Sequence, residues 1–177
     1  MAYIGALDQG TTSTRFIIFN ELGEIITQSQ LEHEQILPQA GWVEHDAEEI
    51  WLNTTRVIAS ALESANIAAS ELKAIGITNQ RETTVCWNRK SGKALTNAIV
   101  WQDTRTADYL NKLSEAQKAL ITQKTGTPIA PYFSASKMAW ILANKISDTS
   151  DLSFGTIDSW LLFKLTGESL PTEHQIN

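Results

Sequence analysis

Two short apolar runs, residues 3–7 and 16–19, open the chain, and a polar stretch of residues 8–15 lies between them. Each run has the length and composition of a buried strand. Turn-forming residues follow at Asn20–Gly23, and residues 24–31 continue as a third extended run. The pattern predicts three consecutive strands joined as a meander.

A helical pattern comes next along the chain. Asp46 and Glu49 have the spacing of a capping box, with Asp in place of the usual Ser or Thr. A buried stripe at helical spacing follows, made by Ile50, Trp51, Thr54, Val57, Ile58, Ala61, Leu62 and Ala65. Residues 73–78 then form a short apolar run, and a strand after a helix indicates a crossover onto the first sheet. We therefore expect a mixed sheet.

The second half of the chain predicts smaller elements. Residues 85–87 and 94–95 have the pattern of a hairpin, and residues 98–101 that of a short strand. We expect a helix over about residues 104–124 that ends at Gly126, with an inner side formed by Leu110, Leu113, Leu120 and Ile121. A further helix after Pro131 carries Met138, Ile141 and Leu142. Residues 154–165 are typical of a strand end that turns into a helix, which Asp158 caps and Gly167 ends.

This order of elements predicts an α/β protein with the ribonuclease-H-like fold of actin, hexokinase and the heat-shock ATPases. Such a domain has a mixed central sheet flanked by helices. Ligands gather in such folds where parallel strands end. Polar segments follow three of the expected strand ends, at residues 8–12, 80–82 and 101–103. We expect the functional site at that edge of the sheet.

The composition narrows the possible partners. The 177-residue chain carries a net charge of −6, which disfavours nucleic acid or an anionic membrane because both require clustered Lys and Arg. Cys86 is the only cysteine, so no disulfide can form within the chain, and His33, His45 and His174 lack metal-ligand spacing. No secretory signal pattern is present, and no apolar stretch reaches the roughly 20 residues that span a bilayer. We expect one domain, located in the cytoplasm.

The polar stretch from Asp8 to Arg15 has the groups needed to hold nucleotide phosphates. Gly10 lets the backbone bend so that successive N–H groups face an anion. Hydroxyls from Thr11, Thr12 and Ser13 and the charge of Arg15 add donors, and Asp8 could hold Mg²⁺ through water. An ordinary hairpin turn is the competing interpretation. The stretch is neither a P-loop nor a dinucleotide fingerprint.

Arg81 and Glu82 form the second informative feature, because adjacent opposite charges at a strand end can bracket two hydroxyls of a polyol. Trp101 could supply a flat apolar wall for such a ligand, and Tyr132, between Pro131 and Phe133, could add a hydroxyl. A solvated turn pair is an equally open interpretation of Arg81 and Glu82, and ordinary packing one of Tyr132. For Trp101 alone, core packing is favoured over a ligand wall.

Six segments together resemble the FGGY carbohydrate kinase family: residues 6–15, 41–46, 76–84, 97–102, 131–134 and 154–161. The resemblance runs in order along the chain to about residue 167, and residues 169–177 fit it only loosely. Within the family, residues 80–84 and 131–134 resemble the members that act on glycerol.

The resemblance implies transfer of the γ-phosphoryl group of ATP to a terminal hydroxyl of glycerol, which gives sn-glycerol 3-phosphate. Carried over position by position, the phosphate ligands are Thr11, Thr12 and Ser13, with Gly10 and Arg15 beside them. Asp8 becomes the Mg²⁺-side carboxylate. The glycerol ligands are Arg81, Glu82 and Tyr132, and Trp101 is the wall of that pocket.

The family is built of two such domains, so we expect residues 1–177 to be an incomplete N-terminal, polyol-binding domain. The general-base aspartate, a second phosphate loop and the adenine pocket of the family would lie beyond residue 177, and no catalytic residue is assigned here. We expect the chain to be inactive alone and the longer enzyme to be a homo-oligomer. The alternatives are an FGGY kinase of a pentulose or of gluconate, and a non-catalytic domain that binds a ligand or a partner.

Overall fold

A computed structural model describes residues 2–168, and residues 169–177, with His174, lie outside the described part. In chain order the elements are β1 Tyr3–Gln9, β2 Ser13–Phe19, β3 Ile25–Glu32, β4 Glu44–His45, α1 Ala47–Ala65, η1 Ala69–Glu71, β5 Leu72–Asn79, β6 Val85–Asn88, β7 Lys93–Ala94, β8 Ala98–Ile99, α2 Ala107–Asn111, α3 Glu115–Thr125, α4 Ser134–Asn144, β9 Leu152–Gly155 and α5 Ile157–Thr166.

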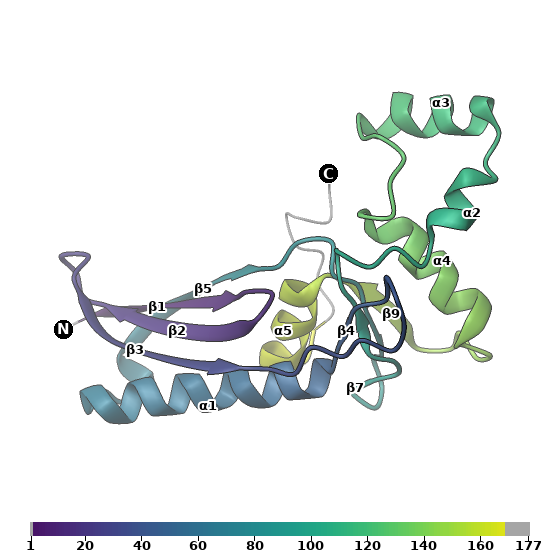
Figure 1. Cartoon of the computed structure of the whole chain (residues 1–177). Coiled ribbons are helices and arrows are strands. Elements are labelled where there is room, and N and C mark those ends of the chain that lie inside the picture. Colours follow the sequence, from purple (N-terminus) through teal and green to yellow (C-terminus); the bar gives the residue numbers. More distant parts are fainter. Residues whose placement is uncertain (1, 169–177) are drawn as a thin grey trace.

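The main sheet has the strand order β3-β2-β1-β5. The first three strands pair antiparallel, and β5 joins β1 in parallel after the crossover through α1. Helix α1 runs along one face of this sheet (Figure 1). The predicted meander, the crossover and the mixed sheet are therefore confirmed. Because β1 and β5 are parallel neighbours, Gln9 and Asn79 lie side by side at the same edge, and the loops after both strands start together.

The main core lies between the sheet, α1 and α5. Phe16 and Ile18 of β2 and Ile50 and Val57 of α1 are fully buried in it. Trp160 of α5 is also fully buried, and its Nε1 donates to the carbonyl of Ala47, at 3.0 Å. This bond satisfies the polar atom of a large apolar side chain and fixes α5 against the start of α1.

A second, smaller apolar cluster joins the remaining strands to α4. Cys86 of β6, Ile99 of β8 and Ile141 of α4 form its buried centre. Burial raises the pKa of the Cys86 thiol to about 11. Strand β6 lies between β7 and β9 in a three-stranded sheet, and β8 pairs with β4 in a separate two-stranded sheet. The predicted strand at residues 98–101 is thus shorter than expected and lies outside the main sheet.

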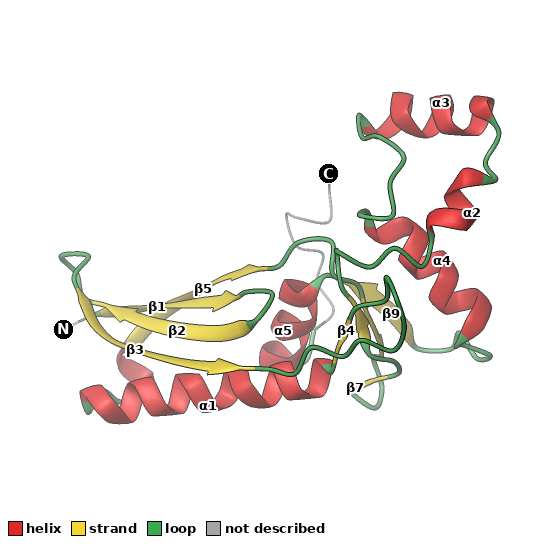
Figure 2. Ribbon diagram, in the orientation of Figure 1, coloured by secondary structure: helices red, strands yellow, loops and turns green. Residues whose placement is uncertain are grey.

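The prediction of one helix over residues 104–124 is wrong, because two helices occupy this segment. α2 ends at Asn111, and α3 begins after Ser114, which forms a capping box with Gln117. The expected inner side is also wrong, since Leu120 and Ile121 are exposed. Together with α4, helices α2 and α3 project away from the main sheet (Figure 2), so the main core does not cover Leu120 and Ile121. Gly126 ends α3 in the left-handed conformation, as predicted.

Two predicted caps also differ. The α5 cap residue is Thr156 rather than Asp158, which lies in the first turn and accepts a hydrogen bond from the Thr156 hydroxyl. Asp46 does cap α1, but its carboxylate accepts from Glu48 N, and Glu49 bonds elsewhere, so no capping box forms. Gly167 ends α5 as expected. Within residues 2–168, no helix combines the length and the apolar character needed to cross a membrane.

Candidate functional site

The predicted phosphate loop is shorter in the structure than the sequence suggested. β1 extends to Gln9 and β2 begins at Ser13, so the turn consists of Gly10–Thr12 and is closed by a 2.9 Å bond from Gly10 N to Ser13 O. Asp8 and Arg15 therefore lie opposite each other on paired strands. Asp8 Oδ2 accepts from an Arg15 nitrogen at 2.8 Å, and each side chain is about two-fifths exposed.

The three carbonyl groups of this turn all accept hydrogen bonds from the chain. Gly10 O accepts from Gln9 Nε2 at 2.8 Å, and Thr11 O accepts from Gln35 Nε2 at 3.0 Å. Thr12 O accepts from His33 N at 3.2 Å. In a trans peptide the next N–H points opposite to the carbonyl, and no peptide bond of the described chain is cis. The N–H groups of Thr11 and Thr12 therefore face away from these partners, an arrangement that suits an anion.

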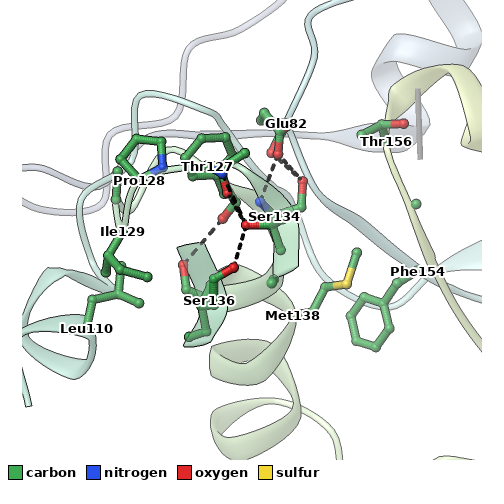
Figure 3. Close-up of a pocket in the computed structure, with 16 residues that line it drawn as sticks. Glu82, Leu110, Thr127, Pro128, Ile129, Ser134, Ser136, Met138, Phe154 and Thr156 are labelled. Atoms are coloured by element: carbon green, nitrogen blue, oxygen red, sulfur yellow. Dashed lines mark hydrogen bonds between the residues drawn. The ribbon is translucent and has the colours of Figure 1, made fainter. Parts of the chain in front are cut away.

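Arg81 and Glu82 follow β5 in a turn that touches the phosphate loop through the 2.8 Å bond from Gln80 N to Gln9 O. Glu82 has a φ of 65°, in the left-handed region that non-glycine residues seldom adopt. Its Oε2 accepts from both N and Oγ of Ser134, each at 2.9 Å (Figure 3). Arg81 is exposed, and within residues 2–168 it makes no ion pair.

Trp101 and Tyr132 meet edge to face, with ring centroids 5.9 Å apart. Trp101 Nε1 also donates to Thr11 Oγ1 at 3.2 Å, so the predicted polyol wall contacts the predicted phosphate loop. Tyr132 is 40% exposed. The structure therefore brings the residues predicted for the two ligands to one edge of the sheet, as expected from the positions of the strand ends.

Lys137 of α4 was not identified from the sequence. Its side chain is fully buried, and Nζ donates to the carbonyls of Pro131 and Tyr132 at 2.7 and 2.6 Å. Burial lowers the pKa of this amine to about 8, against the opposing effects of Glu82 and Asp103. Lys137 thus fixes the backbone that carries Tyr132. A lone Lys on a helix gave no signal, because lysine is rarely fully buried.

Arg105 is a second group that the sequence did not reveal. Its guanidinium binds both carboxylate oxygens of Asp103 at 2.7 and 2.9 Å and reaches Glu44 at 2.8 Å. It also lies over the Trp42 ring, 3.8 Å from the centroid. Asp103, the last residue of the polar segment 101–103, is a buried member of this ion-pair cluster. The cluster fixes the turn that follows Trp101, and it leaves Asp103 unsuited to act as a general base.

A cavity of about 500 Å³ borders Glu82 on the side of α3 and α4 (Figure 3). Its lining is mainly apolar and includes Leu110, Ile129, Phe133 and Met138. None of Arg81, Trp101, Tyr132 or the phosphate loop lines it. The cavity is therefore distinct from the edge where the predicted ligand residues meet. In the described chain, no group of three or more His, Cys, Asp and Glu side chains is arranged to hold a metal.

Known proteins share both the sequence and the fold of this chain. The model of the FGGY family of carbohydrate kinases, N-terminal domain, matches residues 3–176. The chain is 52% identical over 172 residues to a glycerol kinase of Saccharopolyspora erythraea, and 53% identical over 171 residues to one of Pseudarthrobacter chlorophenolicus. These matches cover 94% and 93% of this chain but 34% of each relative. The chain thus spans about a third of the length of these relatives.

Solved structures give the same result for the fold. A Plasmodium falciparum glycerol kinase with ADP matches with a TM-score of 0.85 and 36% identity, over 94% of this chain and 34% of that one. A xylulose kinase of Lactobacillus acidophilus matches with a TM-score of 0.83 and 22% identity, over 96% and 34%. The predicted fold, that of the actin- and hexokinase-like kinases, is confirmed. The chain belongs to the FGGY family of carbohydrate kinases, whose N-terminal domain it carries.

Proposed function

We propose that this chain is the polyol- and phosphate-binding part of a kinase that transfers the γ-phosphoryl group of ATP to a terminal hydroxyl of glycerol. The observation that carries the proposal is the 3.2 Å bond from Trp101 Nε1 to Thr11 Oγ1. It joins the expected wall of the polyol pocket to the expected phosphate loop. A hydroxyl held against Trp101 would therefore lie beside a phosphate held at Thr11, and phosphoryl transfer depends mainly on such positioning.

On the polyol side, the two oxygens of the Glu82 carboxylate have separate roles. Ser134 holds Oε2, and Oε1 has no hydrogen-bond partner within residues 2–168, so it can accept from a ligand hydroxyl. Arg81 next to it can donate to a neighbouring hydroxyl, and the Tyr132 hydroxyl can donate or accept. Three such groups suit a three-carbon polyol better than a longer sugar, which would need more polar partners.

On the nucleotide side, the N–H groups of Thr11 and Thr12 and the charge of Arg15 provide donors for phosphate oxygens. Asp8 is partly exposed, and within residues 2–168 its carboxylate bonds only to Arg15, so a hydrated Mg²⁺ fits beside it. One carboxylate alone does not form a metal site, and the remaining ligands would be water and nucleotide oxygens. The ion would neutralise charge on the transferred group.

The described carboxylates provide no convincing general base. Asp103 binds Arg105, Asp158 accepts from Thr156, and Glu82 is assigned to the polyol. We propose that the base lies in a second domain, as the family resemblance implies, together with the adenine pocket. The relatives are about three times as long as the match, which is consistent with such a domain. A cytoplasmic location and homo-oligomeric assembly remain predictions.

The test is a kinase assay on the fused enzyme, defined here as this chain joined to the remainder of the Saccharopolyspora erythraea glycerol kinase. We expect phosphorylation of glycerol in preference to xylulose and gluconate. Replacing Glu82 by Gln keeps the shape of the side chain and removes its charge, and should weaken glycerol use by roughly ten- to a hundredfold. Glu63→Gln, on the exposed side of α1, is the control. A preference for gluconate or xylulose, or an unchanged glycerol KM and kcat in Glu82→Gln, would refute the proposal.

A further inference from the structure

A closed circuit of hydrogen bonds links the two halves of the site. Gln80 Nε2 donates to Gln9 Oε1 at 3.0 Å and to Gly10 O at 3.2 Å, and Gln80 Oε1 accepts from Thr83 Oγ1 at 2.9 Å. Thr83 Oγ1 in turn accepts from the backbone N of Trp101 at 3.2 Å. The Trp101 ring closes the circuit through Thr11 Oγ1, which is one residue from Gly10. The circuit as a whole joins the polyol wall to the phosphate turn without passing through a ligand.

A second route reinforces the first. His45 Nδ1 lies 3.2 Å from Gln80 Nε2, and His45 Nε2 lies 2.9 Å from Gln35 Oε1. Burial, followed by the nearby His33, lowers the pKa of His45 to about 3, so the ring is neutral at ordinary pH. Because the Gln35 amide oxygen only accepts, the ring proton is on Nε2, which leaves Nδ1 as an acceptor facing Gln80 Nε2. Gln35 then donates to Thr11 O, which returns the route to the phosphate turn.

The central residues of the circuit are sealed from water. Thr83 and His45 are fully buried, and Gln80 is 7% exposed. A bond lost here cannot be replaced by solvent, so its partner remains unsatisfied or moves. The backbone N of Trp101 would lose its Thr83 acceptor, and the carbonyl of Gly10 would keep only its 2.8 Å bond from Gln9 Nε2. Displacement of either changes one half of the site directly and the other half through the circuit.

From this arrangement we propose that Gln80 and Thr83 are positioning residues that couple polyol binding to the geometry of the phosphate turn. A polyol seated against Trp101 restricts the indole, and the indole N–H restricts Thr11. A nucleotide on Thr11 and Thr12 restricts the same ring from the other side. By thermodynamic reciprocity, each ligand should then tighten the binding of the other by the same factor. The inference rests on the proposed function for the identity of the two ligands.

The decisive variant is Thr83→Val, which keeps the side-chain shape and removes the hydroxyl, with Thr83→Ser as the matched control that keeps it. In the fused enzyme, the Kd of glycerol is measured with and without saturating Mg²⁺ and a non-hydrolysable ATP analogue. We expect the nucleotide to tighten glycerol binding about fivefold or more in the parent and in Thr83→Ser. In Thr83→Val the ratio of the two Kd values should approach one. A parental ratio of one, or an unchanged ratio in Thr83→Val, would overturn the proposal.

A second measurement does not depend on the proposed function. In the 177-residue chain, the hydrogen-exchange rate of the Trp101 indole N–H is compared between Thr83→Val and Thr83→Ser. We expect roughly tenfold faster exchange in Thr83→Val, although the hydrogen bond of Thr83 is to the backbone N of Trp101 and not to its indole N–H. Equal rates would contradict the circuit. If Thr83→Val does not fold, Gln80→Met gives the same comparison against the parent, because it keeps the length and removes both polar atoms. If the fused enzyme does not phosphorylate glycerol but the indole N–H of Thr83→Val still exchanges faster, the identity of the ligands would be refuted and the circuit would stand.

Discussion

The carboxylate of Glu82 is held by the first residue of α4. Glu82 Oε2 accepts one hydrogen bond from Ser134 N and one from Ser134 Oγ, each 2.9 Å long. The backbone donor lies at a helix N-terminus, where the partial positive charge favours a carboxylate. The two bonds fix the side chain of a residue whose backbone is in the left-handed region, and they leave the second oxygen for a ligand.

The Ser134→Ala substitution should therefore weaken polyol binding without abolishing it. The alanine removes the Oγ bond and keeps the backbone N–H, so the carboxylate loses about half of its support. We expect the glycerol KM of the fused enzyme to rise roughly two- to tenfold, the effect of one hydrogen bond. Ser70→Ala, at an exposed position of η1, is the control. An unchanged KM would show that the backbone bond alone orients Glu82.

Asp8→Asn should separate the nucleotide side of the site from the polyol side. The substitution keeps the size of the side chain but removes the charge paired with Arg15 and available to a hydrated Mg²⁺. We expect kcat of the fused enzyme to fall about tenfold or more while the KM for glycerol stays nearly constant, which is the pattern of a lost transition-state interaction. Asp108→Asn in α2 is the exposed control. A raised glycerol KM with normal kcat would reverse the assignment.

The buried Lys137 should make the stability of the chain depend on alkaline pH. Burial lowers its pKa to about 8 in the folded state, against 10.5 for the free group. Between these values the unfolded chain binds the proton more strongly, so the free energy of unfolding should rise as pH increases from about 8 to about 10.5. Glu82 and Asp103 favour the charged form and Arg105 opposes it, but burial is the largest effect.

Urea unfolding of the parent and of Lys137→Met across this pH range isolates the contribution of Lys137. Other groups titrate there too, and the comparison cancels them. The stability difference between parent and variant should grow in favour of the parent as pH rises. A difference independent of pH would mean that Lys137 keeps an ordinary pKa in its buried position.

The 177-residue chain should fold alone but should not phosphorylate glycerol. Its two apolar clusters form within residues 2–168, so circular dichroism should show cooperative thermal unfolding. A missing general base alone removes about 10²–10⁴-fold in rate. We also expect concentration-dependent self-association, because Ile4, Ile26 and Leu142 are large apolar side chains more than 40% exposed. Glycerol phosphorylation by the chain at the rate of the fused enzyme would contradict this expectation.

The sequence predicted the elements whose apolar pattern matches a buried surface. The stripe from Ile50 to Ala61 defined α1 because that whole face packs on the sheet. The same reasoning failed for residues 104–124, because the leucines there are not buried by the described core. A local signal was nevertheless available, since Ser114 and Gln117 have the spacing of a capping box. The apolar pattern predicts one continuous helix, whereas this capping box marks the start of a second helix.

The site was predictable only where it follows strand ends. Residues after β1 and β5 had to meet, because parallel neighbours end at the same edge. The supporting contacts of Ser134 and Arg105 span 52 and 61 residues and depend on how α4 and the turn after Trp101 are placed. No local spacing encodes such contacts. Long-range polar pairs of this kind become visible only in the folded arrangement.

Chemical labelling of Cys86 can report on local opening of the structure around it. Cys86 is the only thiol, it is fully buried against Ile141 of α4, and its raised pKa keeps it protonated. A disulfide reagent in solution can label it only after the cluster of Cys86, Ile99 and Ile141 opens, so the labelling rate under native conditions measures that opening. The same helix begins at Ser134, which holds Glu82. Glycerol bound at Glu82 should therefore slow the labelling of a cysteine that it never touches.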